Sequence, residues 1–387
     1  MTGTLSGRRL WFVGIGGAGL SAYAQLARAW GAEVGGWDRA ETPYLEPLRD
    51  LRIVIAPEPF VPEGFEAVVS SAYPAVPGLP RSEFLRQLME GRRSIVVAGT
   101  HGKGTTAAMI AFVLHETGRD PAWLIGAPVP QLGSNAGFGS GYLVVEGDES
   151  DRTVFSLPAE IAVITNVDFD HHSEFASLAE LEDEFARWLA TAPQVVRDAP
   201  PYEGQLALPG ELNRRNAGTA LAALELAGVP RAEAEPAVAR FTGTGRRFEV
   251  HELDGITLVD DYGHHPAEIA ATIAAARERY PGATLRVLFQ PHLYSRTRHL
   301  ARELAEALAG ADDVTVTDIY PAREQPVVGV TGKLVVDALS DLGVLAAWTP
   351  RVEEGAARLR RRARPGDVLL VVGAGDVDRA VRMLADG

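Results

Sequence analysis

The first residue of this chain that could do chemistry is a lysine in a glycine-rich turn. Residues 94–99 read SIVVAG, a β-rich run that ends in glycine, and THGKGTT follows before an Ala-rich helical stretch. Backbone N–H groups in a strand–turn–helix of this kind bind phosphate, and the helix dipole favours its negative charge. Lys103 would reach the outer phosphates, and a hydroxyl just beyond it would coordinate Mg²⁺.

Two facts bear on this loop in opposite directions. Val97 stands where the first glycine of the usual P-loop would fall, so a glycine-rich helix start without a ligand is the alternative interpretation. Lys103 and Lys333 are the only lysines among 37 basic residues. Because arginine and lysine are not interchangeable, this usage favours a retained chemical role for Lys103.

Polar side chains also follow two other apolar runs. Glu146 lies in VVEGDESD, and His171 lies in ITNVDFDHH. Ligands of open α/β sheets lie beyond the carboxyl ends of the strands, so Lys103, Glu146 and His171 converge if their strands are close together in one sheet. A carboxylate and an imidazole beside a nucleotide phosphate suit Mg²⁺. Each turn alone is typical of a solvated loop, and for His172 we favour that interpretation.

A second glycine loop lies near the start of the chain. LWFVGIGGAGL carries Gly14, Gly16 and Gly19 in dinucleotide spacing between a strand and a helix, and Asp38 follows the next apolar stretch. Alone, this pattern indicates a Rossmann site for NAD. Together with the loop around Lys103, it indicates one domain for ATP and another for a different phosphorylated ligand.

The last third of the chain repeats the pattern of polar groups after strands. In GRRFEV two adjacent arginines suit phosphate or carboxylate, with an exposed basic pair as the alternative. LVDDYGHHPAEI places a histidine pair before a proline that can open a helix. LFQPHLYSRTR places His292, Arg296 and Arg298 after another strand.

Strands and helices alternate along the whole chain, which predicts α/β domains with parallel sheets. Strands are expected at Leu10–Val13, Ala67–Ser70, Ser94–Ala98, Tyr142–Glu146, Ile161–Thr165, Ile256–Val259, Leu285–Phe289, Val314–Val316 and Val368–Val372. Helices are expected at Gly19–Trp30, Thr105–Glu116, Ala217–Leu226 and Pro266–Arg279, and Thr191–Leu208 is expected to be a loop. Three domains are predicted, at residues 1–92, 93–243 and 244–387.

Composition excludes several classes of function. The net charge of −14 argues against a nucleic-acid partner. The absence of cysteine excludes disulfides, thiolate metal sites and a cysteine nucleophile. No apolar run is long enough to span a membrane, and the first residues lack the pattern of a signal peptide. A cytoplasmic protein is therefore expected.

Taken together, the motifs resemble those of the Mur ligases, in the same order and over nearly the whole chain. They are GTHGK, EGDESD, TNVDFDH, LPGELNRRNA, GRRFE, DDYGHHPAEI, FQPHLYSRT, DIYPARE and GAGD. The HHP and QPHLYSRT elements resemble in particular the branch of the family that adds L-alanine to UDP-N-acetylmuramate.

This resemblance implies a Rossmann-like N-terminal domain for the UDP-substrate, a P-loop-type central ATPase domain and a Rossmann-like C-terminal domain that brings L-alanine. It also implies an ADP-forming ligase of peptidoglycan precursor synthesis, with ATP and Mg²⁺ as cofactors and with links to cell wall biogenesis, cell shape and cell division. ATP would phosphorylate the muramate carboxylate, and the alanine amine would attack the acyl phosphate. We expect a monomer or weak homodimer that closes its domains around the substrates.

The resemblance also assigns expected roles to individual residues. The UDP-substrate would be bound by Gly14, Gly16, Gly17, Gly19, Asp38, Ser70 and Ser71. ATP would be bound by Gly99, Thr100, His101, Gly102, Lys103, Gly104, Thr105, Asn213, Asn216, Arg247 and Asp261. Mg²⁺ would be bound by Thr105, Glu146 and His171. The residues expected to act in catalysis are Lys103, Arg296, which would receive the amino acid carboxylate, and His265 nearby.

The chain departs from the family pattern at several places. Gly104 stands where the branch has a threonine, so Thr105 is the expected Mg²⁺ ligand, as in the Lys-Gly-Ser version of the folylpolyglutamate synthetases. Gly147 replaces an alanine and Leu212 replaces a histidine. Ala190–Gln205 is much shorter than the corresponding stretch of family members.

The sequence also admits three alternative functions. A related acid–amino acid ligase, such as one that recycles muropeptides, would use the same scaffold. A nucleotide-binding paralogue with lost activity would account for Gly104 and the short central domain. An NAD-dependent oxidoreductase would explain the first glycine loop but leaves the loop around Lys103 without a role.

Overall fold

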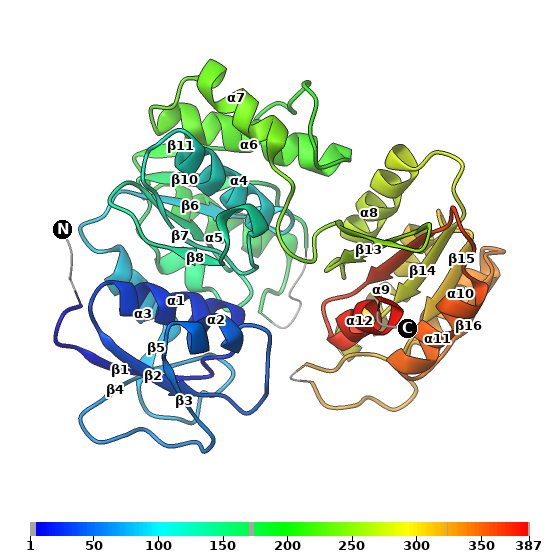
Figure 1. The fold of residues 1–387 in the computed structure, drawn as a ribbon, viewed down its shortest axis with the longest axis horizontal. Coiled ribbons are helices and arrows are strands. Elements are labelled where there is room, and N and C mark those ends of the chain that lie inside the picture. The colour runs from blue at the N-terminus through cyan, green and yellow to red at the C-terminus, as the bar shows by residue number, and fades with distance from the viewer. Residues whose placement is uncertain (1–4, 170–173, 323, 386–387) are drawn as a thin grey trace. The chain divides into compact units, whose positions relative to one another are not determined.

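The computed structural model describes residues 5–169, 174–322 and 324–385, which form three parallel-rich β-sheets with accompanying helices (Figure 1). The chain divides into two compact units. The first unit comprises Met1–Ala207 with Asn213–Thr244, and the second comprises Leu208–Leu212 with Gly245–Gly387. The first unit holds two sheets and the second unit holds one.

The first sheet is parallel and has the strand order β3-β2-β1-β4-β5. Its strands are β1 (Arg9–Val13), β2 (Glu33–Trp37), β3 (Val54–Ala56), β4 (Glu66–Val69) and β5 (Leu79–Pro80). The accompanying helices are α1 (Ala18–Ala29), α2 (Leu45–Asp50) and α3 (Arg81–Met89). Figure 1 shows α1 and α3 on the side of this sheet that is turned towards the second sheet.

Both faces of the first sheet are apolar, because successive side chains of a strand point to opposite faces. Leu10 and Phe12 of β1 belong to a core that the helices and the second sheet share. Trp11 and Val13 belong to a smaller cluster on the other face. The shared core explains why the first two sheets form one compact unit.

The second sheet has the order β11-β10-β6-β9-β7-β8, with only the β7–β8 pair antiparallel. Its strands are β6 (Ser94–Ala98), β7 (Ala122–Leu124), β8 (Ala136–Gly137), β9 (Leu143–Glu146), β10 (Ile161–Ile164) and β11 (Gln194–Val196). Its helices are α4 (Lys103–Glu116), α5 (Leu178–Leu189), α6 (Glu211–Leu226) and α7 (Arg231–Arg240), with 3₁₀ turns η1 (Pro130–Leu132) and η2 (Thr153–Ser156). Every α4 residue from Thr105 to Leu114 is buried, as expected of a helix with apolar side chains all round.

The third sheet has the order β12-β13-β17-β14-β15-β16, with only the β12–β13 pair antiparallel. Its strands are β12 (Glu249–Leu253), β13 (Ile256–Asp261), β14 (Leu285–Phe289), β15 (Asp313–Val316), β16 (Ala346–Trp348) and β17 (Val368–Val372). Its helices are α8 (Pro266–Arg279), α9 (Tyr294–Leu308), α10 (Lys333–Asp341), α11 (Val352–Arg362), α12 (Arg379–Ala385) and the 3₁₀ turn η3 (Asp376–Asp378). Its central strand β17 is completely buried.

All nine strands expected from the sequence are confirmed, with shifts of at most two residues at their ends. The helix expected at Pro266–Arg279 is also confirmed. The loop expected at Thr191–Leu208 was wrong at Gln194–Val196, which forms the edge strand β11. β11 has only three residues and pairs with a neighbouring strand on one side only, so its hydrophobic pattern is too short to be detected. The helix expected at Ala217–Leu226 begins earlier, at Glu211.

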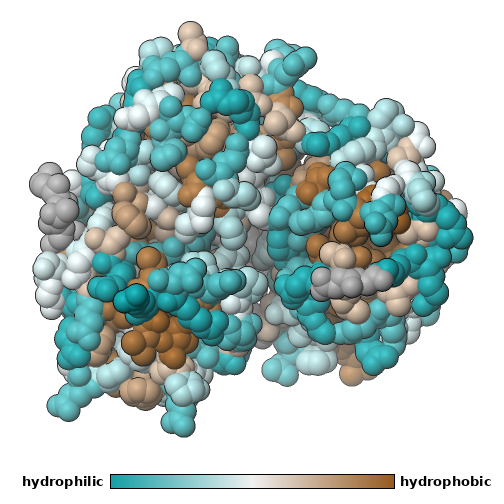
Figure 2. Space-filling model, viewed as in Figure 1, coloured by the Kyte–Doolittle hydropathy of each residue, from teal (hydrophilic) through white to brown (hydrophobic). Residues whose placement is uncertain are grey.

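Hydrophilic side chains cover most of the viewed surface of both units, and hydrophobic residues appear there in small groups (Figure 2). Among the described residues, no helix is long and apolar enough to cross a membrane.

Candidate active site

The loop between β6 and α4 is built around two glycines with positive φ. Gly99 has a φ of +124°, and a Cβ there would lie 2.3 Å from Thr165 Oγ1. Gly102 has a φ of +78°, and a Cβ there would lie 2.2 Å from Asn216 Oδ1. L-residues with side chains rarely adopt this conformation, and no space for a side chain exists at either position. The loop therefore requires glycine at both places.

Asn166, which follows β10, holds this loop in place. Thr100 N donates to Asn166 O at 3.1 Å, and His101 N donates to Asn166 Oδ1 at 2.9 Å. Asn166 Nδ2 in turn donates to His101 O at 2.7 Å. The motif TNVDFDH contains Asn166, but its role could not be predicted, because a sequence does not show which backbone groups a side-chain amide will contact. These bonds occupy the N–H groups of Thr100 and His101, whereas the N–H groups of the first turn of α4 have no partner within the helix.

Lys103 opens α4 and is bound by its own loop and by the turn that follows β9. Its Nζ donates to Glu149 Oε1 at 3.0 Å and to Gly99 O at 3.2 Å. Burial alone would lower the pKa of Lys103, but the nearby carboxylates of Glu149, Asp148 and Glu146 raise it above its ordinary value. The side chain is therefore a permanent cation at the mouth of the loop. Glu149 is completely buried, and its role as the counter-ion was missed from the sequence.

Glu146 lies at the end of β9, beside the start of α4. A Cβ on Gly104 would lie 3.2 Å from each oxygen of the Glu146 carboxylate. Gly126 N donates to Glu146 Oε2 at 2.6 Å. The carboxylate is therefore held between two glycines, next to the turn of α4 that carries Lys103 and the buried Thr105.

The order of the strands confirms the condition for convergence at this sheet edge. β6, which leads to Lys103, is paired on one side with β9 and on the other with β10. His171, the third predicted Mg²⁺ ligand, lies outside the described residues. Within the described parts of the chain, no group of three or more His, Asp or Glu side chains could hold a metal ion. The carboxylate of Glu146 beside the start of α4 nevertheless fits Mg²⁺, because Mg²⁺ prefers a few hard oxygen ligands together with phosphate.

Asn213 and Asn216 lie on the first turns of α6. Asn216 is buried against Gly102 of the loop, and its Nδ2 donates to Asn213 Oδ1 at 3.3 Å. The structure thus brings these two predicted ATP ligands to the phosphate loop.

The first glycine loop also has the predicted surroundings. Gly14 has a φ of +88°, and a Cβ there would lie 2.8 Å from the Cβ of Ser70. Asp38 Oδ2 accepts a hydrogen bond from Gly16 N at 2.8 Å, so this carboxylate shapes the loop itself. Ser70 N donates to Val13 O at 3.0 Å. The ends of β1, β2 and β4 therefore gather the loop, Asp38 and Ser70 into one place, because β1 lies between the other two strands.

In the second unit, Asp261 and Arg247 are both engaged by neighbouring groups. Asp261 accepts from Phe248 N at 2.9 Å and from Gly263 N at 2.7 Å. Burial raises the pKa of Asp261 above its ordinary value, although Arg247 opposes this shift. Arg247 Nη1 donates to Glu268 Oε1 at 3.1 Å. The two residues that were expected to contact ATP thus also stabilise the turns on which they lie.

His265 has a clear structural role at the start of α8. It is the N-cap residue, and its Nδ1 accepts from Ala267 N at 3.4 Å. Glu268 Oε2 reaches back to His265 N at 3.4 Å and to His264 N at 3.1 Å, which completes a capping box.

A row of four rings crosses the strand ends of the third sheet. Centroids are separated by 5.7 Å for Tyr262 and His264, 5.6 Å for His264 and His292, and 5.9 Å for His292 and Tyr320. Arg296, predicted to receive a carboxylate, is buried and donates from Nη1 to His292 Nδ1 at 3.1 Å. The structure therefore places Arg296 beside this row.

Backbone strain accompanies the same turn. Leu293, between His292 and Arg296, has φ +70° and ψ 134°, a combination that a residue with a side chain rarely adopts. Its N–H donates to Tyr320 O at 3.0 Å. Strain of this kind is typical of functional sites, where the surroundings hold the backbone in place.

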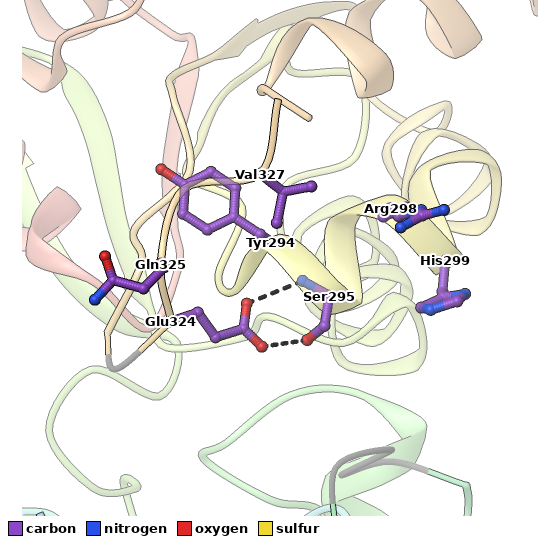
Figure 3. Close-up of a pocket in the computed structure, with 7 residues that line it drawn as sticks. All are labelled: Tyr294, Ser295, Arg298, His299, Glu324, Gln325 and Val327. Carbon is purple, nitrogen blue, oxygen red and sulfur yellow. Dashed lines mark hydrogen bonds between the residues drawn. The ribbon is translucent and has the colours of Figure 1, made fainter. Parts of the chain in front are cut away.

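A hollow of about 310 Å³ lies beside the first turns of α9 (Figure 3). It is lined by Tyr294, Ser295, Arg298, His299, Glu324, Gln325 and Val327. The Glu324 carboxylate accepts from Ser295 N at 2.9 Å and from the Ser295 hydroxyl, which ties the segment after β15 to the helix that carries Arg296. Arg298 is among the polar residues noted in the sequence after the preceding strand, but no ligand was predicted for any residue of this hollow.

Three parallel-rich sheets, two of them with glycine loops at their carboxyl edge, define an enzyme that uses a nucleotide. Family models agree with this class over most of the chain. They are the Mur ligase family catalytic domain over residues 9–93, the Mur ligase middle domain over residues 97–197 and the Mur ligase glutamate ligase domain over residues 246–375. The chain belongs to the Mur ligase family and is an ATP-dependent acid–amino acid ligase. The NAD-dependent oxidoreductase interpretation was therefore wrong.

Individual relatives are similar over almost their whole length. A UDP-N-acetylmuramate–L-alanine ligase from Streptomyces coelicolor is 36% identical, covering 95% of this chain and 94% of the relative. One from Acidithiobacillus ferrooxidans is 35% identical, covering 96% of both. The crystal structure of the UDP-N-acetylmuramate–alanine ligase from Thermotoga maritima is 26% identical, covers 98% of both chains and superposes with a TM-score of 0.84. The Streptomyces alignment runs over 436 positions, more than the 387 residues here, so that relative has segments that this chain lacks.

Proposed function

We propose that this chain joins the carboxylate of UDP-N-acetylmuramate to the amine of L-alanine, with conversion of ATP to ADP and phosphate, as a step of peptidoglycan precursor synthesis in the cytoplasm. The observation that carries this proposal is the sheet edge where β6 lies between β9 and β10, with Lys103 at the start of α4 and Glu146 at the end of β9. The names of the similar ligases support the choice of substrates.

ATP would be held at the start of α4. The N–H groups of its first turn and the Lys103 ammonium would bind the outer phosphates. Thr100 and His101 would shape the loop through Asn166 instead of donating their own N–H groups. Asn213 and Asn216 of α6 would bind the nucleotide, as would Arg247 and Asp261.

Mg²⁺ would be bound by Glu146 and Thr105, with His171 as the third ligand, and would neutralise charge on the phosphates. Gly104 fits this arrangement, because a side chain there would press on the Glu146 carboxylate.

The reaction would proceed in two steps. An oxygen of the muramate carboxylate attacks the terminal phosphorus of ATP, the bond from that phosphorus to ADP breaks, and an acyl phosphate forms. The alanine amine then attacks the acyl carbon, the amine loses a proton, and phosphate leaves as the amide forms. Lys103 would stabilise the charge of the transferred phosphoryl group, and Arg296 would receive the alanine carboxylate through a charge-assisted contact. His265 would remain close to the amino acid as part of the cap of α8.

The UDP-substrate would lie on the first glycine loop, with its diphosphate at the start of α1. Gly14, Gly16, Gly17 and Gly19 would allow close approach of the backbone, with Asp38, Ser70 and Ser71 around the loop. We further propose a monomer or weak homodimer that binds neither nucleic acid nor membrane.

The test is phosphate release from ATP and Mg²⁺, with UDP-N-acetylmuramate and L-alanine added together or singly. We expect release that requires both, and a product whose mass equals that of the amide. We expect no phosphate release from the Lys103→Met variant, whereas Lys333→Arg, on the surface of α10, should still release phosphate. Release with UDP-N-acetylmuramate and a tripeptide, but not with L-alanine, would instead identify a muropeptide ligase.

A further inference from the structure

The acidic turn after β9 lies between cations from the first and second sheets. This turn, Asp148–Asp151, carries three carboxylates in four residues. Two positively charged side chains reach it, Lys103 from the phosphate loop and Arg81 from the start of α3. All of these residues belong to the first compact unit, in which the two sheets share one core.

Arg81 forms ion pairs with two carboxylates of this turn. Its Nη2 lies 3.2 Å from Asp148 Oδ2, and its Nε lies 3.3 Å from Asp151 Oδ2. The side chain is only 17% exposed, so water weakens these contacts much less than those of a surface ion pair. Burial alone would raise the pKa of Asp148, but Arg81 and Lys103 outweigh it and lower that pKa to about 2.

The remaining nitrogen of Arg81 faces the first glycine loop. Its Nη1 lies 3.6 Å from the position that a Cβ on Gly19 would take. Gly19 is in the first turn of α1, where an anion would meet free N–H groups. The Arg81 guanidinium therefore lies against the first glycine loop and also binds the turn Asp148–Asp151. Through Glu149, the same turn contacts Lys103 of the phosphate loop.

Backbone hydrogen bonds to its own carboxylates hold the turn in shape. Asp148 Oδ1 accepts from Ser150 N at 3.0 Å, and Asp151 Oδ1 accepts from Thr153 N at 3.1 Å. Arg152 has a φ of +61°, which fixes the chain direction after the turn. Glu149, at the centre of the turn, is the carboxylate that binds Lys103 Nζ at 3.0 Å.

We propose that Arg81 is a positioning residue that couples the first glycine loop to the ATP loop through the turn Asp148–Asp151. This inference rests on the proposed function, because the ligand of the first loop is taken to be UDP-N-acetylmuramate. A diphosphate at the start of α1 fixes the Arg81 guanidinium, and the guanidinium fixes the turn that holds Lys103. Occupancy of the first loop then strengthens ATP binding, and ATP strengthens binding of the UDP-substrate by the same factor.

The test measures the dissociation constant of a non-hydrolysable ATP analogue, with and without saturating UDP-N-acetylmuramate. In the wild-type enzyme we expect the ratio of the two constants to be about five or more. In Arg81→Gln we expect a ratio within about twofold of one, with UDP-N-acetylmuramate still able to bind at higher concentration. Arg86→Gln is the matched control, because Arg86 lies on the same helix and pairs with Glu83 at the surface. It should keep the wild-type ratio.

Arg81→Lys keeps the charge and serves if Arg81→Gln fails to fold. A lysine can reach only one of the two carboxylates at a time, so its ratio should fall between those of wild type and Arg81→Gln. A wild-type ratio near one overturns the inference, as does a wild-type ratio retained by the Arg81 variants. If the wild-type enzyme does not bind UDP-N-acetylmuramate at all, the proposed function fails together with it.

Discussion

At the scale of single residues, the Glu146 carboxylate has space because two of its neighbours are glycines. Gly104 and Gly126 leave no side chain against its carboxylate, and a Cβ on either would lie 3.2 Å or 2.9 Å from the nearest oxygen. Glycine in place of the family threonine at position 104 therefore leaves space for this carboxylate. The carboxylate can lie directly on the backbone of α4.

This arrangement predicts the outcome of Gly104→Ala. The backbone there is helical, so alanine should stabilise α4 by up to about 1 kcal/mol. The new Cβ should also displace the Glu146 carboxylate and weaken Mg²⁺ binding about tenfold. Thermal unfolding and the Mg²⁺ dependence of phosphate release measure the two effects separately. Unchanged Mg²⁺ dependence would show that Glu146 is not held where the metal binds.

Lys103 should tolerate no substitution, including arginine. Its Nζ lies within 3.2 Å of both Glu149 Oε1 and Gly99 O, a site that suits a compact ammonium better than a planar guanidinium. We expect Lys103→Arg and Lys103→Met each to lower kcat by about 10²–10³-fold or more. Steady-state phosphate release gives kcat, and Lys333→Arg is the control. An active Lys103→Arg enzyme would mean that only the charge matters at this position.

Residue types at strand ends could be predicted, but their partners could not. The sequence identified Lys103 because a strand and a glycine-rich turn precede it. It identified Glu146 because this residue lies where a strand ends in a polar turn. It gave no role to Arg81, Asn166 and Glu149, whose importance comes from contacts across 46 or more residues of chain. Such pairs depend on which strands are neighbours, and one sequence does not contain that information.

At the scale of elements, the hydrophobic character of short segments was sufficient to predict the central strands. The fully buried runs SIVVA and VLLVV were placed correctly because each is a continuous apolar segment of strand length. Short edge strands such as β11 and β16 are only partly buried and were not expected. The first turn of α6 was also missed, because asparagines and arginines there interrupt the apolar pattern.

A buried amide joins α1 to the second sheet and provides a test at this scale. Gln25 Nε2 donates to Asn135 Oδ1 at 2.8 Å, and Gln25 Oε1 accepts from Ser134 Oγ at 2.9 Å. Gln25→Ala leaves both partners without these bonds, so we expect a loss of about 2 kcal/mol in the free energy of unfolding. Urea unfolding measures it, with Arg28→Ala on the exposed part of α1 as control. Equal losses in both variants would show that the amide contributes nothing specific.

At the scale of the whole molecule, each unit contains an aspartate with a shifted pKa, and the two shifts have opposite directions. The 51 aspartate and glutamate residues are the side chains that titrate at low pH. In the first unit, burial would raise the pKa of Asp148, but Arg81 and Lys103 lower it to about 2. In the second unit, burial raises the pKa of Asp260 to about 6, although Arg246 opposes the shift with an ion pair of 3.1 Å.

These shifts predict a different pH dependence for each unit. Asp148 binds its proton more weakly in the folded chain than its ordinary pKa of 3.8, so its stabilising effect is present above about pH 4 and is lost as the pH falls towards 2. Asp260 binds its proton more tightly in the folded chain, so its effect is present below about pH 4 and is lost as the pH rises through 6. Unfolding midpoints in urea between pH 3 and 7 should therefore fall less steeply at low pH in Asp148→Asn. In Asp260→Asn they should lose the decline between pH 4 and 6. If Asp260→Asn kept that decline, Arg246 would hold Asp260 ionised throughout, and the ion pair would outweigh the cost of its burial.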